Sequence, residues 1–492
     1  MGQGFYEKQL IALVSCCALI LFVEHILSRI KKVNRDAVEA QIEDGGRVSN
    51  ATLLGKLTRQ YLFVYAMVSS TLVQAKLVFQ PGADWLQGPY VYSLYREQYK
   101  FPERLVALLF VTGFSSGALT APLIGAWADQ YGRKRICLAF CVTYALSCVC
   151  IFVPYLPILL IGRSLGGISG SILFSAFESW LISASNNAGL ADSDLSRIMG
   201  RASLVNGLVA TGAGVVSNQL VSSTSNFGSP FLLSGTILVF AWFVIASSWK
   251  ENFGSTEANT RNDSILQVGR LTQAWKVARQ DKVLLILGLT QTSFEGSMYL
   301  FVFLWVPSLQ EASHSPNISP LPLGYIFSAF MISMMLGSLL YTAVTSHYLT
   351  SSPRSNDSSL SVHAKLSSLV CAISGLALAA SVTSRNERIR FWCFCVFEAC
   401  VGMYYPVQGM LRGTLISNEH RATLSSLFRV PLNVFVVVSL LTGVSSARYA
   451  VLSASSVMLG FSAIMTGLVI VNHADNHSNS RDVGRGLLRR PW

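Results

Sequence analysis

Long apolar runs separated by short polar stretches dominate this 492-residue chain. A helix needs about 20 predominantly apolar residues to cross a bilayer. The predicted spans are 10–27, 61–95, 104–127, 136–153, 156–183, 199–222, 228–248, 283–309, 322–347, 362–383, 390–416, 423–445 and 449–471. Because runs of this kind favour helices whose backbone groups are satisfied internally in lipid, the pattern predicts an all-α membrane protein.

The spans form one leading helix and two sets of six, divided by a polar and basic stretch. The predicted parts are an extra N-terminal span with a basic cytoplasmic loop (1–60), a six-helix bundle (61–248), a cytoplasmic linker (249–282), a second six-helix bundle (283–471) and a disordered cytoplasmic tail (472–492). Two such bundles with a solute site near the midplane are typical of secondary transporters.

Composition supports the lipid bilayer as the environment. Only 13% of residues are charged, against about 25% in soluble domains, and the mean hydropathy is +0.47. The net charge of +12 lies mostly in short loops and near the C-terminus. Basic residues in such places indicate the orientation of the spans in the membrane rather than a surface that binds nucleic acid. We expect a multi-pass protein of the plasma membrane, because no clear retrieval signal ends the chain.

The sequence offers little for an enzyme. The ten cysteines lie almost wholly in apolar runs, where reduced packing residues are expected. There is no nucleotide-binding loop, metal-ligand cluster or nucleophile set in the sequence pattern. We therefore predict no catalytic residue, no metal and no cofactor.

A short stretch between two spans carries the most specific motif. Its expected loop has glycines at both ends, one acid and three consecutive bases. These residues are Gly125, Asp129, Gly132, Arg133, Lys134 and Arg135. The bases indicate the cytoplasmic side, and the glycines allow two helices and a turn to approach closely.

Three acids follow phenylalanine inside predicted spans: Glu178, Glu295 and Glu398. A charged carboxylate facing lipid is costly, so these side chains should face the bundle interior. Burial favours the neutral carboxyl, which makes them candidates for proton coupling or gating. The alternative is that they form interhelical salt bridges that fix the packing.

Arg163 and Arg429 are the candidate anion-binding residues, because a guanidinium group offers several donors in one plane to an oxyanion. Asn433 lies one turn after Arg429 and can add an amide donor on the same face. The alternative is that each arginine pairs with a buried acid or a carbonyl group.

Asp84, Tyr90 and Tyr404 complete the predicted substrate-binding set. A Gly-Pro pair interrupts the span that holds Asp84 and Tyr90, and a broken helix that lines a cavity exposes backbone dipoles to a solute. Tyr404 lies in a setting similar to that of Tyr90, because Tyr405 and Pro406 follow it directly. The alternative is a proline kink beside an aromatic belt.

The chain resembles a known family. The stretch 125–135 and Arg163-Ser-Leu-Gly-Gly167 resemble two motifs of the major facilitator superfamily. Asp84–Tyr90, Ile172–Trp180, Phe294-Glu295 with Phe301–Pro307, and Phe428–Leu432 together resemble the molybdate-anion transporter family of that superfamily. The resemblance covers about residues 61–472 and implies uptake of molybdate or a related oxyanion by alternating access, with protons as a candidate coupling ion.

One stretch departs from that family pattern. Residues 71–82 lengthen the span that leads into Asp84 and include Lys76 and Pro81. Two other functions remain open from the residues alone: a porter for sugars or other organic solutes, which the tyrosine and tryptophan side chains would suit, and a non-transporting membrane sensor.

Overall fold

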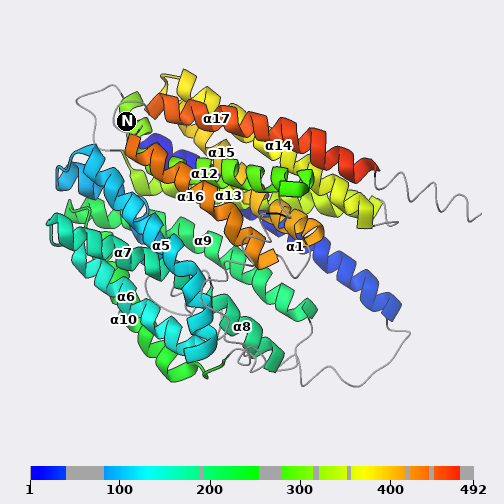
Figure 1. Ribbon diagram of the computed structural model, residues 1–492, viewed down its shortest axis with the longest axis horizontal. Helices are drawn as coiled ribbons and strands as arrows, with labels where there is room; N and C mark the ends of the chain where they lie inside the picture. The colour runs from blue at the N-terminus through cyan, green and yellow to red at the C-terminus, as the bar shows by residue number, and fades with distance from the viewer. Residues whose placement is uncertain are drawn as a thin grey trace, which may run out of the picture. The chain divides into compact units, whose positions relative to one another are not determined.

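The computed structural model describes residues 2–39, 83–173, 175–187, 192–253, 276, 279–313, 321–351, 356–416, 421–442 and 448–476. Within these ranges the regular elements are all helical (Figure 1). The stretch 71–82, where the chain departs from the family pattern, lies outside them.

The helices of the first half follow most of the predicted spans there. They are α1 (Gly2–Glu39), α3 (Ala83–Gln87), α4 (Val91–Ser93), η1 (Leu94–Gln98), α5 (Glu103–Tyr131), α6 (Arg133–Cys150), α7 (Leu156–Leu173), α8 (Ala176–Asn187), α9 (Asp192–Thr224) and α10 (Ser229–Ser248). One predicted span, 156–183, is interrupted between α7 and α8. Ser175 lies in a turn there, and its hydroxyl donates to the carbonyl of Ser171 at 2.8 Å, a local bond of the kind that bends helices.

The second half has the same character. Its helices are α12 (Lys282–Ala312), α13 (Leu323–Ser351), α14 (Asn356–Thr383), α15 (Glu387–Leu415), α16 (Arg421–Thr442), α17 (Arg448–Met465) and η3 (Thr466–Val471). Asp281 and Asn386 cap α12 and α15: their side chains accept from the backbone N–H groups of Val283 at 2.8 Å and Arg388 at 2.9 Å. Such caps satisfy donors that have no partner within the helix.

Seven helices in the described part of the chain are long and apolar enough to cross a membrane. Among them are α10, with 20 residues, and the span Leu323–Tyr348 of α13, with 26. The structure thus describes a multi-pass helical membrane protein, while the arrangement of one plus six plus six spans stays a prediction.

The chain divides into two compact units. Unit 1 comprises Met1–Asn262 with Ile318–Ile332, and unit 2 comprises Asp263–Asn317 with Ser333–Trp492. The domain bounds predicted from the sequence stay a prediction. Each unit is described by itself below.

In unit 1, α6 packs against α7 and α10, and α5 packs against α7 (Figure 1). The short α3 packs against α9 and α10. The contact between α5 and α7 is very close, because a Cβ atom placed on Gly167 would collide with the carbonyl oxygen of Gly113. Only small residues permit such an approach between helix backbones.

In unit 2, α14 packs against α15 and α17, and α12 packs against α15, α16 and α17. A second close approach joins α13 and α15. A Cβ atom on Gly402 would collide with the carbonyl oxygen of Met334, and one on Gly337 with that of Ala399. Both units therefore contain at least one helix pair whose close approach depends on glycine.

Candidate functional site

A polar cluster lies inside unit 1, around the first residues of α3. The hydroxyl group of Tyr144 on α6 donates a hydrogen bond to Oδ1 of Asp84. Arg163 on α7 attracts the Asp84 carboxylate electrostatically. No ion pair joins Asp84 to Arg163 among the described side chains. Both residues are half-buried, whereas Tyr144 is buried.

The Arg163 guanidinium is held in place by three neighbours. Its Nε donates to the carbonyl of Leu109 at 3.3 Å, it hydrogen-bonds with the Tyr95 side chain, and it lies 5.2 Å from the centre of the Phe110 ring. A guanidinium has five N–H donors, so these contacts leave donors available. A Cβ atom on Gly113 would lie 3.0 Å from Nη2, so glycine leaves the space that the guanidinium occupies.

The same arginine lines a small cavity between α3, η1, α6, α7 and α10. The lining residues are Gln87, Tyr95, Ser147, Ile151, Leu159, Gly162, Arg163 and Phe231. Ser147 donates to the carbonyl of Gly162 at 2.7 Å, and the Gln87 amide donates to the Cys148 sulfur at 3.3 Å. The lining of this cavity therefore includes both polar and apolar side chains.

Tyr90 is packed against neighbouring side chains of unit 1. Its hydroxyl donates to the Asn218 side chain at 3.1 Å, and its ring stacks on Phe227 with the centroids 5.8 Å apart. Only 3% of its surface is exposed. The turn at residues 88–90 does interrupt the helix between α3 and α4, and Trp85 in the same segment donates to Asn206 at 3.0 Å.

A second cluster lies in unit 2 and brings two predicted site residues together. The Tyr404 hydroxyl on α15 donates to Oε1 of Glu295 on α12 at 3.4 Å. The Phe294 ring stacks on Tyr404 with centroids 3.9 Å apart and an interplanar angle of 2°. The Gln291 amide approaches Oε2 of Glu295 at 3.5 Å. Glu295 is therefore a buried carboxyl group set among hydrogen-bonding side chains.

The other predicted site residues are not gathered with these clusters. Glu398 is buried on α15, and its side chain makes no hydrogen bond or ion pair within the described ranges. Asn433 is half-buried on α16. Glu178 lies in α8 and Arg429 in α16, but the structure does not describe their side chains.

The predicted loop at 125–135 is shorter in the structure. Helix α5 continues to Tyr131 and α6 begins at Arg133, so Gly125 and Asp129 lie in a helix. The intervening residues include alanines and a glutamine, which helices accept readily. Only Gly132 leaves the helical conformation, with φ 102°, a region that favours glycine.

Glu251, which follows α10, packs directly against this turn. Its Oε1 accepts from the backbone N–H of Lys134 at 2.8 Å, and a Cβ atom on Gly132 would lie 2.6 Å from its carboxyl carbon. Arg135 lies at 4.0 Å from Oε2. The three bases have different partners: Arg133 donates to the carbonyl of Ser179 at 3.1 Å.

Neighbours of Glu251 anchor the same segment to α8. The indole N–H of Trp180 donates to the carbonyl of Lys250 at 2.9 Å, and the Asn252 amide donates to the carbonyl of Trp180 at 3.1 Å. The rings of Trp180 and Trp249 stack with centroids 3.7 Å apart. The first residues of the predicted linker 249–282 thus form part of unit 1.

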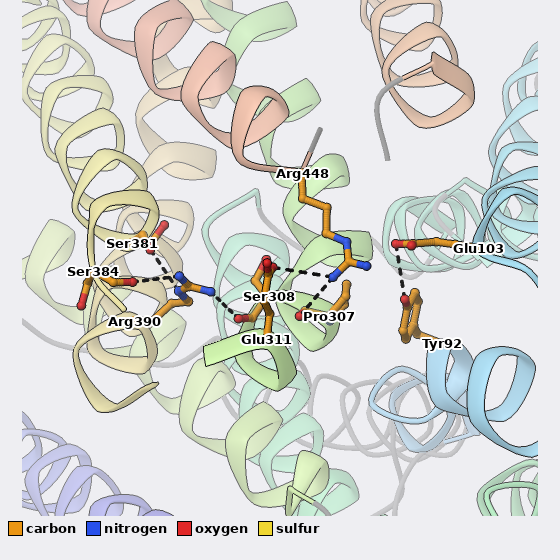
Figure 2. A network of polar contacts seen from close by, with 9 residues as sticks. All are labelled: Tyr92, Glu103, Pro307, Ser308, Glu311, Ser381, Ser384, Arg390 and Arg448. Atoms are coloured by element: carbon orange, nitrogen blue, oxygen red, sulfur yellow. Dashed lines mark hydrogen bonds and ion pairs between the residues drawn. The ribbon is translucent and has the colours of Figure 1, made fainter. Parts of the chain in front are cut away.

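A buried arginine that sequence reasoning missed lies in unit 2. Arg390 is only 2% exposed and donates to the carbonyls of Ser308 at 2.5 Å, Ser381 at 3.0 Å and Ser384 at 2.8 Å (Figure 2). Ser381 and Ser384 lie at the C-terminal end of α14, where carbonyl groups lack helical partners. The signal in the sequence was a basic residue just inside a predicted span.

Figure 2 also shows Arg448, which lies 3.8 Å from Oε2 of Glu311 and donates to the carbonyl of Pro307 at 3.5 Å. Arg390 and Arg448 therefore both hold the C-terminal end of α12. In unit 1, the Tyr92 hydroxyl donates to Glu103 at 3.5 Å. None of these contacts involves a predicted site residue.

Comparisons with known proteins agree with this fold. Residues 39–394 match a family described as sugar transporters with 12 transmembrane segments. Molybdate-anion transporters of Takifugu rubripes and Danio rerio are 34% and 33% identical to this chain, and each alignment covers 73% of this chain and 76% of the relative. A molybdate-anion transporter of Xenopus tropicalis is 30% identical, covering 73% and 75%.

Solved structures of transporters share the architecture. The nucleoside transporter NupG matches with a TM-score of 0.57 and 13% identity, covering 84% of this chain and 98% of that one. The peptide transporter POT in complex with sulfate matches with a TM-score of 0.63 and 11% identity, covering 85% and 95%. At this level of identity the match concerns the fold.

Proposed function

Since the chain belongs to the molybdate-anion transporter family of the major facilitator superfamily, we propose that it takes up molybdate across a membrane by alternating access. The observation that carries the substrate is the 34% identity to a molybdate-anion transporter over 388 residues. The plasma membrane is the proposed location, since uptake into the cell requires it.

Arg163 is the proposed anchor for the oxyanion in the first bundle. It borders a cavity, it is only half-buried, and its planar donors match the oxygen geometry of a tetrahedral anion. Arg429 and Asn433 are the proposed donors in the second bundle.

Asp84, Tyr90 and Tyr404 have supporting roles in this proposal. Asp84 balances the charge of Arg163, and Tyr404 orients Glu295 through its hydroxyl group. Tyr90 holds the broken segment to α9 through Asn218. Their hydrogen bonds support a role in shaping the site rather than in direct contact with the anion.

Protons are the proposed coupling ion, carried by Glu295 with Glu178 and Glu398 as further candidates. Glu295 and Glu398 are buried carboxyl groups inside long helices, and intramembrane acids of this kind mark proton pathways in many transporters. Gly132 and the three bases that follow it at the start of α6 are the proposed cytoplasmic gate element.

The test is uptake of labelled molybdate at nanomolar concentration into cells that express the full chain, with surface expression verified. Saturable uptake that excess tungstate blocks and excess sulfate does not block supports the proposal. Absence of uptake by a surface-exposed protein contradicts it.

A second candidate function is transport of a sugar or another organic solute, which the description of the matching family favours. The same assay separates the two. Competition by sugars, with no effect of tungstate, would replace the oxyanion by an organic solute. Tungstate competition without any sugar effect excludes that alternative.

A further inference from the structure

Asp84 stands in an unusual place for an anion transporter, because its carboxylate carries the same sign of charge as the proposed substrate. It belongs to the cluster of Tyr144 and Arg163, next to the cavity that Arg163 lines. An acid beside the cation of an anion site must therefore be explained.

The charges in the cluster are not balanced once an anion is bound. With an ionised Asp84 and an empty site, Arg163 and Asp84 sum to zero. A bound dianion beside the same two groups leaves two uncompensated negative charges, and their repulsion is strong in a poorly solvated interior. Protonation of Asp84 removes one of these charges and leaves the full charge of Arg163 for the anion.

The groups around Asp84 allow its carboxyl group to gain or lose a proton without rearrangement. From α6 it faces Tyr144 and Cys148, and from α7 it faces Arg163. Helix α10 presents the Ser234 hydroxyl, which donates to the carbonyl of Ala83 at 2.6 Å. A Tyr144 hydroxyl that donates to Oδ1 serves both forms of the carboxyl group, since Oδ2 remains available for the proton.

We propose that Asp84 is a proton-operated counter-charge for Arg163: ionised, it neutralises the arginine of the empty site, and protonated, it releases the arginine to bind the oxyanion. This inference rests on the proposed oxyanion transport and adds a residue and a role to it. One proton from the outer solution bonds to an Asp84 oxygen as the anion arrives. The proton and the anion leave together on the inner side, and Asp84 returns to the ionised form.

The fixed position of Arg163 fits a competition between the Asp84 carboxylate and the anion for its positive charge. The guanidinium is fixed by the Leu109 carbonyl, by Tyr95 and by the face of Phe110, so it does not have to move between two partners. The state of Asp84 changes the potential at a cation that stays in position. Preorganised donors of this kind minimise the ordering that binding requires.

The experiment measures binding of labelled molybdate to the purified full chain from pH 5.5 to 8, and proton entry into proteoliposomes with an internal pH dye. In the wild type, affinity should fall as pH rises, by up to about tenfold per pH unit. Asp84→Asn keeps an oxygen acceptor for Tyr144 and carries no charge. It should bind as tightly at pH 8 as the wild type at pH 5.5, and fewer protons should enter with each anion.

Two further variants keep the result interpretable. Tyr144→Phe removes the hydrogen bond but no charge, and should move the midpoint of the pH profile to higher pH. Asp475→Asn, at an exposed carboxylate of unit 2, should behave as the wild type. An Asp84→Asn variant that binds at pH 5.5 yet keeps the wild-type pH dependence overturns the inference and leaves the proposed function intact. A wild type that binds neither molybdate nor tungstate overturns both.

Discussion

The carboxylate of Glu251 accepts a hydrogen bond from the backbone N–H of Lys134 at 2.8 Å, across 117 positions of sequence. It thereby caps the N-terminus of α6, where donors lack helical partners. Because Glu251 also lies against Gly132, the residues after α10 and the turn between α5 and α6 pack against each other. Glu251 is therefore an acidic partner of the basic motif at this turn.

Gly132→Ala should destabilise the protein. Its φ of 102° is unfavourable for alanine, and the added Cβ would lie 2.6 Å from the Glu251 carboxyl carbon. The backbone strain alone costs about 1–3 kcal/mol. The melting temperature in detergent should therefore fall by several degrees. Gly170→Ala is the matched control, because a Cβ atom there meets nothing within 4 Å. Equal melting temperatures for both variants would contradict this interpretation of the turn.

Arg163→Ala and Arg429→Ala should each abolish molybdate uptake while the protein still reaches the membrane. Removing a guanidinium removes a charge and several donors at once, and Arg163→Lys should restore little, because an ammonium group cannot present a planar pair of donors. Uptake rates normalised to surface protein provide the measurement. Full uptake by both alanine variants would exclude the proposed anion site.

Glu295→Gln should flatten the pH dependence of the transport rate. A glutamine keeps an oxygen for the Tyr404 hydroxyl but cannot exchange a proton. Tyr404→Phe is the companion variant: it removes the hydrogen bond, keeps the ring stacked on Phe294 and should retain a pH response. An unchanged pH profile in Glu295→Gln would assign Glu295 a purely structural role.

The helices were largely predictable from the sequence, because the length of an apolar run limits where a span can begin and end. The prediction of 228–248 corresponds to α10 at Ser229–Ser248, and 283–309 corresponds to α12 at Lys282–Ala312. The turn at Ser175 between α7 and α8 was not predicted. A serine that bonds back to its own helix leaves no mark in hydrophobicity.

The composition of the site was less predictable than its helices. Asp84 and Arg163 were identified because charges are rare in spans. Tyr144 was not identified, since a tyrosine 60 positions away has no spacing relation to Asp84. The same applies to Glu251 at the turn and to the three carbonyls around Arg390. Tertiary pairs of this kind depend on how the helices pack, and periodicity within one helix carries no information about it.

Arg390→Met should lower the melting temperature more than Arg385→Ala. The first change leaves the carbonyls of Ser308, Ser381 and Ser384 without their donor, at about 1–3 kcal/mol for each carbonyl that stays buried and unpaired. Arg385 is exposed in the same connection, and surface substitutions usually change stability by less than about 0.5 kcal/mol. Similar losses for both variants, measured by thermal unfolding in detergent, would show that Arg390 does not hold these helix ends together.

Two glycines of the same helix, α15, test its close approach to α13: Gly402→Ala and Gly409→Ala. A Cβ atom on Gly402 would collide with the backbone of Met334, whereas one on Gly409 meets nothing within 4 Å. Backbone atoms cannot turn aside as a flexible side chain can, so the helices must separate, and overpacking of this kind costs about 1–3 kcal/mol. Gly409→Ala should instead be neutral or stabilise by up to about 1 kcal/mol, because alanine reduces the entropy of the unfolded chain. Thermal unfolding of both variants decides the matter: a Gly402→Ala protein as stable as Gly409→Ala would mean that α13 and α15 do not depend on glycine for their contact.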